Sequence, residues 1–204
     1  MLTFIYLVAI TAEAMSGALA AGRRSMDIFG VAVVAFVTAL GGGTVRDLIL
    51  GHYPIGWTQH PPYIYLVIGA GLLTIVVAPY MHHLKRTFLV LDALGLVAFS
   101  LIGCDVALQM NYPVAVVTMA GMITGIFGGI LRDVLCAQVP VVFQREIYAI
   151  VSLAVCGLFL SLRALGVDQE INTVISFAAG LSLRLAAIYF SWSLPTFAYD
   201  RRWD

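Results

Sequence analysis

One stretch decides the organisation of this chain: Thr38-Ala39-Leu40-Gly41-Gly42-Gly43-Thr44-Val45-Arg46-Asp47. It returns 86 residues later as Thr124-Gly125-Ile126-Phe127-Gly128-Gly129-Ile130-Leu131-Arg132-Asp133, and at the same offset Pro54 aligns with Pro140. A Gly-Gly-x-x-Arg-Asp pattern that occurs in two apolar segments, each followed by an aligned proline, is hard to reach by chance. We therefore interpret the chain as a duplicated unit.

The composition excludes most classes of soluble protein. Of the 204 residues, 61% are apolar and 11% are charged, whereas soluble domains average about 45–50% apolar and about 25% charged residues. Lys+Arg and Asp+Glu balance at 11 each, which argues against a nucleic-acid partner, and three cysteines in or beside apolar runs argue against a disulfide-bonded secreted domain. We predict an all-α polytopic membrane protein in which residues 1–204 form a single transmembrane domain.

Seven stretches are long and apolar enough to cross a membrane as helices, which takes about 20 residues each. They are Leu2–Ala21, Ile28–Leu50, Tyr63–Met81, Phe88–Leu108, Pro113–Cys136, Ile147–Leu162 and Ile171–Trp192. The loops between them are short and contain glycine, proline and asparagine, so they leave no room for a separate soluble domain.

Basic residues in the loops predict the orientation. Seven follow the first, third, fifth and seventh spans: Arg23, Arg24, Lys85, Arg86, Arg145, Arg201 and Arg202. Only Arg163 lies on the other side. Because basic loops stay in the cytoplasm, we expect the N-terminus outside and the C-terminus in the cytoplasm.

The duplicated unit contains three spans, so its second copy enters the membrane upside down. We predict two inverted three-helix repeats, about 1–82 and about 87–164, plus a seventh helix at about 170–193. Transport proteins are often built from inverted repeats, with the functional pathway at the repeat interface.

Glycines stand about two-thirds of the way along the middle span of each copy. They are Gly41, Gly42 and Gly43 in the first copy and Gly128 and Gly129 in the second. Because glycine costs about 1 kcal/mol relative to alanine inside a helix, we expect both spans to break or kink here. Thr44 would then cap a new half-helix. The alternative is that the glycines only allow close helix packing.

Charged residues follow these glycines and stand at other depths of the spans. They are Arg46, Asp47, Arg132 and Asp133 after the glycines, and Glu13, Asp92 and Arg184 elsewhere. Such charges usually face a protein interior or a water-filled cavity. Neighbouring helical residues point about 100° apart, so we expect each arginine to pair with a distant acid and not with the adjacent aspartate. Four acids against three arginines favour a path for cations. The alternative is that these charges form structural ion pairs.

Enzyme chemistry has little support in the sequence. The four histidines lie in or beside loops, and no motif for nucleotide, phosphate or zinc binding occurs. We expect no catalytic residue, no metal site and no cofactor, apart from permeant monovalent cations and bound lipid.

The chain resembles the bacterial branch of the trimeric intracellular cation (TRIC) channels. The resemblance rests on the doubled Gly-Gly-x-x-Arg-Asp pattern, on Ser16-Gly17-Ala18-Leu19-Ala20-Ala21-Gly22-Arg23-Arg24 and on Leu91-Asp92-Ala93-Leu94-Gly95. It implies a homotrimer in the bacterial inner (plasma) membrane, among membrane lipids. Each subunit would hold its own pore, lined by spans one, two, four and five, with glycine kinks in spans two and five. Phe127 replaces the first glycine of the second triplet, so the two kinks are expected to differ in flexibility.

Three functions compete at this point. The resemblance implies a channel for monovalent cations, mainly potassium and sodium. Some members of the same family are similar to carriers of glycine or another small amino acid, for which half-helix N-termini at Thr44 and Ile130 would hold the substrate carboxylate. A scaffold or lipid-binding subunit without transport is the third, and two symmetric helix breaks at membrane depth argue against it.

Overall fold

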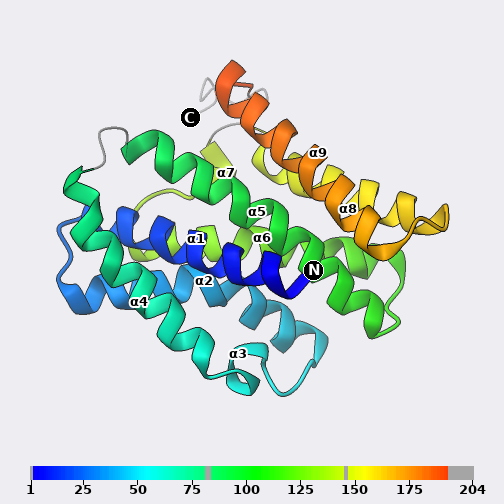
Figure 1. Cartoon of the computed structure of the whole chain (residues 1–204), viewed down its shortest axis with the longest axis horizontal. Helices are drawn as coiled ribbons and strands as arrows, with labels where there is room; N and C mark the ends of the chain where they lie inside the picture. The colour runs from blue at the N-terminus through cyan, green and yellow to red at the C-terminus, as the bar shows by residue number, and fades with distance from the viewer. Residues whose placement is uncertain (1, 81–83, 145–146, 193–204) are drawn as a thin grey trace, which may run out of the picture.

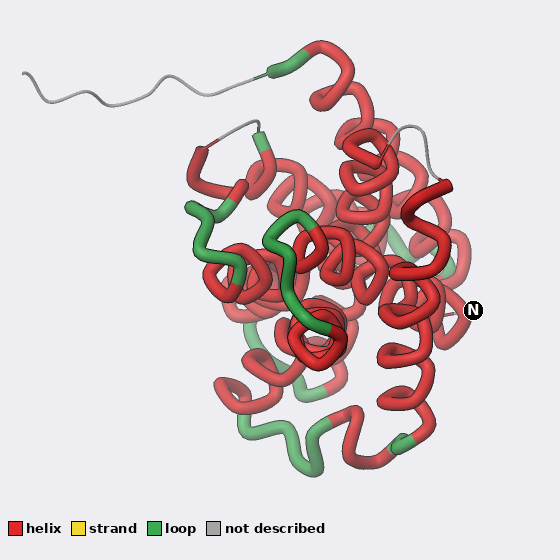
Figure 2. The backbone as a smooth tube through the Cα atoms, turned by 90° about the vertical axis from the view of Figure 1, so that its left-hand side faces the viewer, coloured by secondary structure: helices red, strands yellow, loops and turns green. Residues whose placement is uncertain are grey.

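The computed structural model describes residues 2–80, 84–144 and 147–192, and every regular element in these ranges is helical (Figure 2). The long helices are α1 (Leu2–Gly22), α2 (Ile28–Leu50), α4 (Pro62–Val77), α5 (Leu84–Gln109), α6 (Val114–Leu135), α8 (Tyr148–Ala164) and α9 (Gln169–Phe190). The short elements are α3 (Gly56–Gln59), the 3-10 turn η1 (Ala78–Tyr80) and α7 (Val141–Gln144). The prediction of an all-α chain is confirmed.

Each predicted span coincides with one long helix, and Ile28–Leu50 matches α2 at both ends. Six helical segments are long and apolar enough to cross a membrane, while α8 is apolar but has only 17 residues. The chain is therefore a membrane protein, and the count of seven spans stays a prediction. Four residues used in the sequence analysis lie outside the described ranges: Met81, Arg145, Arg201 and Arg202.

Several helices begin or end at residue types that favour a helix end. Asp27 caps α2 by accepting a hydrogen bond of 2.7 Å from the Gly30 N–H, and Asp168 caps α9 through the Glu170 N–H at 2.9 Å. Gly51 ends α2 in the left-handed conformation, with φ of 67°. These are the residue types that satisfy the free N–H and C=O groups at helix ends.

Four helices form a ring at the centre of the fold. α1 packs on α2 and α5, and α6 packs on the same two helices, whereas the diagonal pairs α1–α6 and α2–α5 make only minor contacts. These are the first, second, fourth and fifth predicted spans. Figure 1 shows α4 on one side of the ring, where it contacts α1 and α2, and α8 with α9 on the other, against α5 and α6.

The charged residues gather toward the two ends of this ring. We name these ends after their arginines. At the Arg46 end, where α1 begins, Leu2 and Arg46 line one cavity. At the Arg132 end, Arg132 contacts Ser16 in the second half of α1. The ring thus holds two separate charged clusters, described next.

Candidate functional site

The glycines of the repeated pattern lie where α2 crosses α6. Gly42 rests against the main-chain carbonyl of Thr124, and Gly128 rests against the main-chain carbonyl of Thr38. In each case a Cβ atom on the glycine would overlap the carbonyl oxygen. The two contacts are reciprocal, because Thr124 and Gly128 follow Thr38 and Gly42 by 86 residues. Glycine is therefore required at both positions by the distance between the helix backbones.

The expectation of a break at the glycines is wrong, while the expectation of a kink there stays a prediction. Both α2 and α6 are continuous through them. Thr44 does not cap a new half-helix, since its hydroxyl donates to the Leu40 carbonyl at 2.8 Å within the same helix. An unbroken helix satisfies its own main-chain groups, and at membrane depth this outweighs the weak helix propensity of glycine. The main-chain contacts of Gly42 and Gly128 support a role of these two glycines in close helix packing.

The other glycines of the pattern have different surroundings. Gly41 faces the side chain of Leu131, which would lie 2.8 Å from an added Cβ. Gly43 and Gly129 have room for a methyl group, because the nearest atoms to an added Cβ would be at ordinary contact distances of 3.9 Å and 3.5 Å. Among these five glycines, Gly42 and Gly128 are the ones that main-chain contact fixes.

Arg46 and Asp47 form an ion pair at the Arg46 end, although they are adjacent in sequence. Arg46 Nε and Nη2 donate to Asp47 Oδ1 at 3.0 Å and 2.7 Å. His52 Nδ1 lies 3.0 Å from the same oxygen, and the Gly56 N–H donates to Oδ2 at 3.1 Å. The aspartate therefore ties the end of α2 to the loop and to α3.

Arg132 and Asp133 repeat this pair at the Arg132 end. Arg132 Nε donates to Asp133 Oδ1 at 2.8 Å, and Oδ2 accepts from the Val141 N–H at the start of α7 at 2.9 Å. The prediction that neighbouring Arg and Asp do not pair is wrong in both halves, because the arginine side chain is long and flexible enough to reach the adjacent carboxylate.

Arg132 also has a distant acidic partner, as the sequence predicted, and a serine partner that it did not predict. Its Nη1 donates to Asp92 Oδ1 on α5 at 2.6 Å and to Ser16 Oγ on α1 at 2.9 Å. The Phe88 ring lies 4.7 Å from its guanidinium carbon. One arginine thus joins three helices of the ring, and only 1% of its surface is exposed.

Two further predicted residues are buried in the same region. Glu13 on α1 is 3% exposed, and the charges that act on it are those of Asp92, Arg132 and Asp133. Arg184 on α9 is fully buried, with its guanidinium carbon 4.6 Å from the Tyr148 ring. The structure therefore brings Glu13, Asp92, Arg132 and Asp133 together, and it places Arg46 and Asp47 at the opposite end.

Sequence reasoning missed several members of these clusters. Ser16, Tyr6 and His52 were not singled out, because single polar residues in or beside apolar helices carry little signal alone. The repeat could have predicted one of them, because Tyr6 precedes Asp92 by 86 residues. Tyr6 lines a cavity with Arg46, and its counterpart Asp92 binds Arg132, the counterpart of Arg46.

A cavity of about 350 Å³ opens at the Arg46 end. It is lined by aromatic, charged and amide side chains that include Tyr6, Arg46, His60, Tyr63 and Asp105. A narrower space of about 30 Å³ also borders Tyr6 and Arg46 and reaches Gly43 and Thr124 near the crossing of α2 and α6. Space lined by both polar and apolar side chains thus extends from this end toward the middle of the ring.

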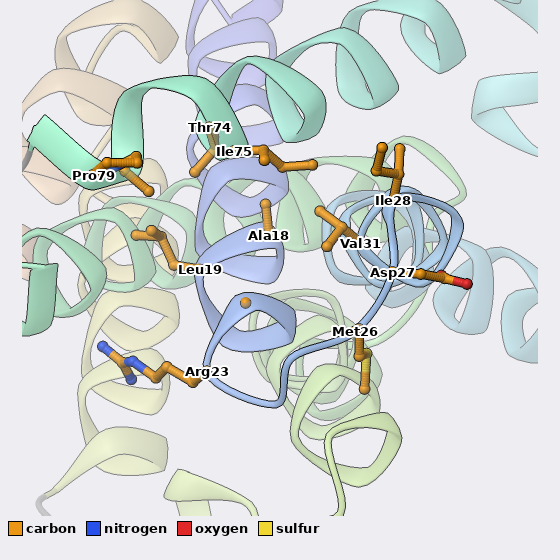
Figure 3. A pocket seen from close by; sticks show the side chains of 12 residues that line it. Ala18, Leu19, Arg23, Met26, Asp27, Ile28, Val31, Thr74, Ile75 and Pro79 are labelled. Atoms are coloured by element: carbon orange, nitrogen blue, oxygen red, sulfur yellow. The ribbon is translucent and has the colours of Figure 1, made fainter.

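Another pocket, of about 450 Å³, lies between α1, the start of α2 and the end of α4 (Figure 3). Most of its lining is apolar, as at Leu19, Val31 and Ile75. The guanidinium of Arg23 stacks on the Phe88 ring at 4.7 Å. The same ring lies 4.7 Å from the guanidinium of Arg132, so this pocket adjoins the Arg132 end.

Solved structures with the same fold are TRIC proteins. The TRIC trimeric intracellular cation channel orthologue from Rhodobacter sphaeroides is 34% identical, with a TM-score of 0.90 over 94% of this chain and 98% of that one. The chain belongs to the bacterial TRIC family. A structure reported as the basis for conductance through TRIC cation channels matches this TRIC protein with 33% identity and a TM-score of 0.89, over 97% of this chain and 98% of that one.

Sequence comparisons agree with this assignment. The UPF0126 inner membrane protein YadS of Escherichia coli (strain K12) is 38% identical over 198 residues, which is 95% of each chain. A family model described as "Glycine transporter" matches residues 3–79 and 89–164 of this TRIC protein. The two matches begin 86 residues apart, which is the offset of the repeated pattern.

The two ends of this TRIC protein share a scaffold but differ in polar residues. At the offset of 86, Phe99 and Tyr6 correspond to Glu13 and Asp92. Phe99 and Tyr6 border Arg46 in the narrow space at the Arg46 end, whereas Glu13 and Asp92 surround Arg132. The Arg–Asp pair is common to both ends, whereas at these two matched positions only the Arg132 end has carboxyl groups.

Proposed function

We propose that this protein is a channel for monovalent cations, potassium and sodium, with a pathway inside each subunit. The pathway follows the axis of the ring of α1, α2, α5 and α6 and passes the crossing at Gly42 and Gly128. The observation that carries the proposal is the enclosure of two buried charged clusters by these four helices in a fold shared with TRIC cation channels. Charges at such depth are costly unless they serve a polar path or are fully paired.

The cavity at the Arg46 end, which has charged and amide side chains among apolar ones, supports this pathway. Its side chains can exchange contacts with a hydrated ion, and the narrower space leads toward the crossing. A channel needs several weak sites in series and not one tight site. The arginine pairs and the acids at the Arg132 end would supply further sites along the same axis.

Unitary currents in a planar bilayer test the proposal. We expect the purified protein to give currents of many picoamperes in symmetric potassium chloride, and a reversal potential close to that of potassium in a gradient. A carrier turns over too slowly for such currents. Protein-free bilayers are the control, and a reversal potential close to that of chloride would contradict cation selectivity.

A carrier of glycine or another small amino acid is the second candidate. The family model that matches the chain is described as "Glycine transporter", and the cavity at the Arg46 end offers Arg46 and Asp105 to a zwitterion. The continuous helices remove the half-helix site first expected for its carboxylate. Glycine counterflow in vesicles, without unitary currents, would favour the carrier over the channel.

We further propose seven membrane spans arranged as two inverted repeats and a seventh helix. The reciprocal contacts of Gly42 and Gly128 support this arrangement, and so does the offset of 86 residues between the two family-model matches. Apolar α8 would be the sixth span.

We expect the N-terminus outside and the C-terminus in the cytoplasm of a bacterium, in its inner membrane. The support is the excess of basic residues after odd-numbered spans and the inner-membrane description of the E. coli relative. A C-terminal alkaline phosphatase fusion, active only outside the cytoplasm, should be inactive, and a C-terminal green fluorescent protein fusion should fluoresce. The reverse pattern would contradict both the orientation and the odd number of spans.

We also propose a homotrimer surrounded by membrane lipids, without a nucleic-acid partner. The Rhodobacter sphaeroides relative is described as trimeric, and α4 exposes apolar side chains such as Leu73 and Val76 that can contact lipid or a neighbouring subunit. The apolar pocket in Figure 3 is large enough to hold part of a lipid chain.

A further inference from the structure

The Arg132 end holds more buried acid than its nearest arginine can pair. Glu13, Asp92 and Asp133 are 3%, 1% and 4% exposed and act together on one guanidinium. The next buried cation is Arg184, beyond the Tyr148 ring. Arg23 lies 4.7 Å from the same Phe88 ring as Arg132, but its side chain is exposed and it is therefore not counted among the buried groups. Three buried acids against two buried arginines leave one negative charge.

The hydrogen bonds show which acid is left over. Arg132 directs Nε to Asp133 and Nη1 to Asp92 and Ser16. Oε2 of Glu13 is fully buried and has no hydrogen-bond partner among the residues that the structure describes. A buried charge without a partner is costly, so a carboxyl group at this place needs a positive ligand or a proton.

The scaffold does not require these acids. At the Arg46 end the corresponding positions hold Phe99 and Tyr6, and Arg46 still pairs with Asp47 at 2.7 Å. Glu13 and Asp92 are therefore additions to an arginine–aspartate pair that forms without them. A structural role accounts for Asp92, which pairs with Arg132 at 2.6 Å, but it leaves the unpartnered oxygen of Glu13 unexplained.

The main chain of α5 makes room for the Glu13 carboxyl group. Gly95 stands directly beside it, and a Cβ atom at this position would overlap Glu13 Oε1. The carboxyl group is thus held between α1 and α5, on the same side of the ring as Asp92, three residues before Gly95 on α5.

We propose that Glu13 and Asp92 bind one partly dehydrated monovalent cation, K⁺ or Na⁺, at the unpartnered oxygen of Glu13. One such ion balances the one remaining negative charge of the cluster. The inference rests on the proposed channel function, for which it names a cation site inside the pathway. Two carboxylates make a weak site, as conduction demands.

Cation-dependent thermal unfolding tests the site without any measurement of transport. Purified protein is heated in potassium chloride or in N-methyl-D-glucamine chloride of the same ionic strength. We expect Tm to rise with potassium for the wild type, because an ion that binds only the folded state stabilises it. In Glu13→Gln, the potassium concentration for half-maximal stabilisation should rise at least about tenfold, since loss of a close charge costs a decade or more of affinity.

Glu170→Gln is the matched control, because it makes the same change at an exposed position on α9, outside the ring. Its potassium response should equal that of the wild type. Should Glu13→Gln not fold, Asp92→Asn gives the same readout and is expected to lose the same response.

Two results would overturn the site: equal stabilisation of the wild type by both salts, or an unchanged potassium response in both Glu13→Gln and Asp92→Asn. Failure of the channel is a distinct outcome. A wild type that responds to potassium through Glu13 but gives no unitary currents would keep the site and reject the channel.

Discussion

Alanine at Gly42 or at Gly128 is expected to lower the free energy of unfolding by about 3 kcal/mol, the upper end of the usual cost of overpacking. The reason is that the added Cβ meets a main-chain carbonyl of the opposite helix, Thr124 for Gly42 and Thr38 for Gly128. A flexible side chain could turn away, but the main chain can move only if α2 and α6 separate. Thermal unfolding of the purified variants in detergent measures the loss. We expect a failure of folding before any specific effect on transport.

The neighbouring glycines supply matched controls. Gly43→Ala and Gly129→Ala introduce the same methyl group one residue further along each helix, where nothing lies closer than 3.5 Å. Alanine should be tolerated there and could add up to about 1 kcal/mol from its higher helix propensity. If all four alanine variants lost stability equally, close packing at the crossing would not be the reason for Gly42 and Gly128.

Arg132→Met is expected to cost about 3–5 kcal/mol, which is typical when one partner of a buried ion pair is removed. The arginine binds Asp133, Asp92 and Ser16 from three helices. Methionine has a similar length and is apolar, so the loss is of charge and hydrogen bonds more than of volume. The effect is measured by the unfolding temperature. It is also measured by size-exclusion chromatography, as the fraction of protein that elutes as a single assembled species.

Arg46→Met provides the comparison. Asp47 keeps the Gly56 N–H and His52 as hydrogen-bond partners after this change, so we expect a smaller cost of roughly 1–3 kcal/mol, as for a polar group left partly satisfied. An equal or larger loss in Arg46→Met would show that the extra partners of Arg132 add nothing to stability.

The positions of the helices could be predicted from apolar runs and their breakers. The predicted Ile28–Leu50 and α2 have the same ends, because Asp27 and Gly51 are a favoured cap and a favoured stop. The short helices α3 and α7 were missed, since four residues are too few to show a helical period.

Two local arguments failed for different physical reasons. Helix propensity suggested a break at the glycines, but a membrane penalises unpaired main-chain groups more than it penalises glycine. Side-chain direction suggested that Arg46 and Asp47 do not meet, but the argument neglected the reach of an arginine. The contact of Arg132 with Ser16 joins residues 116 apart, and only a tertiary structure can show it.

The crossing of α2 and α6 also limits which second-site mutations can compensate for others. Gly41 faces the side chain of Leu131, so a larger residue at 41 can be accommodated by a smaller one at 131. Gly42 and Gly128 face main-chain carbonyls, which remain whatever side chain the opposite helix carries. A substitution at Gly41 can therefore be compensated by a second substitution at Leu131. A substitution at Gly42 or Gly128 cannot be compensated by any second substitution in the opposite helix.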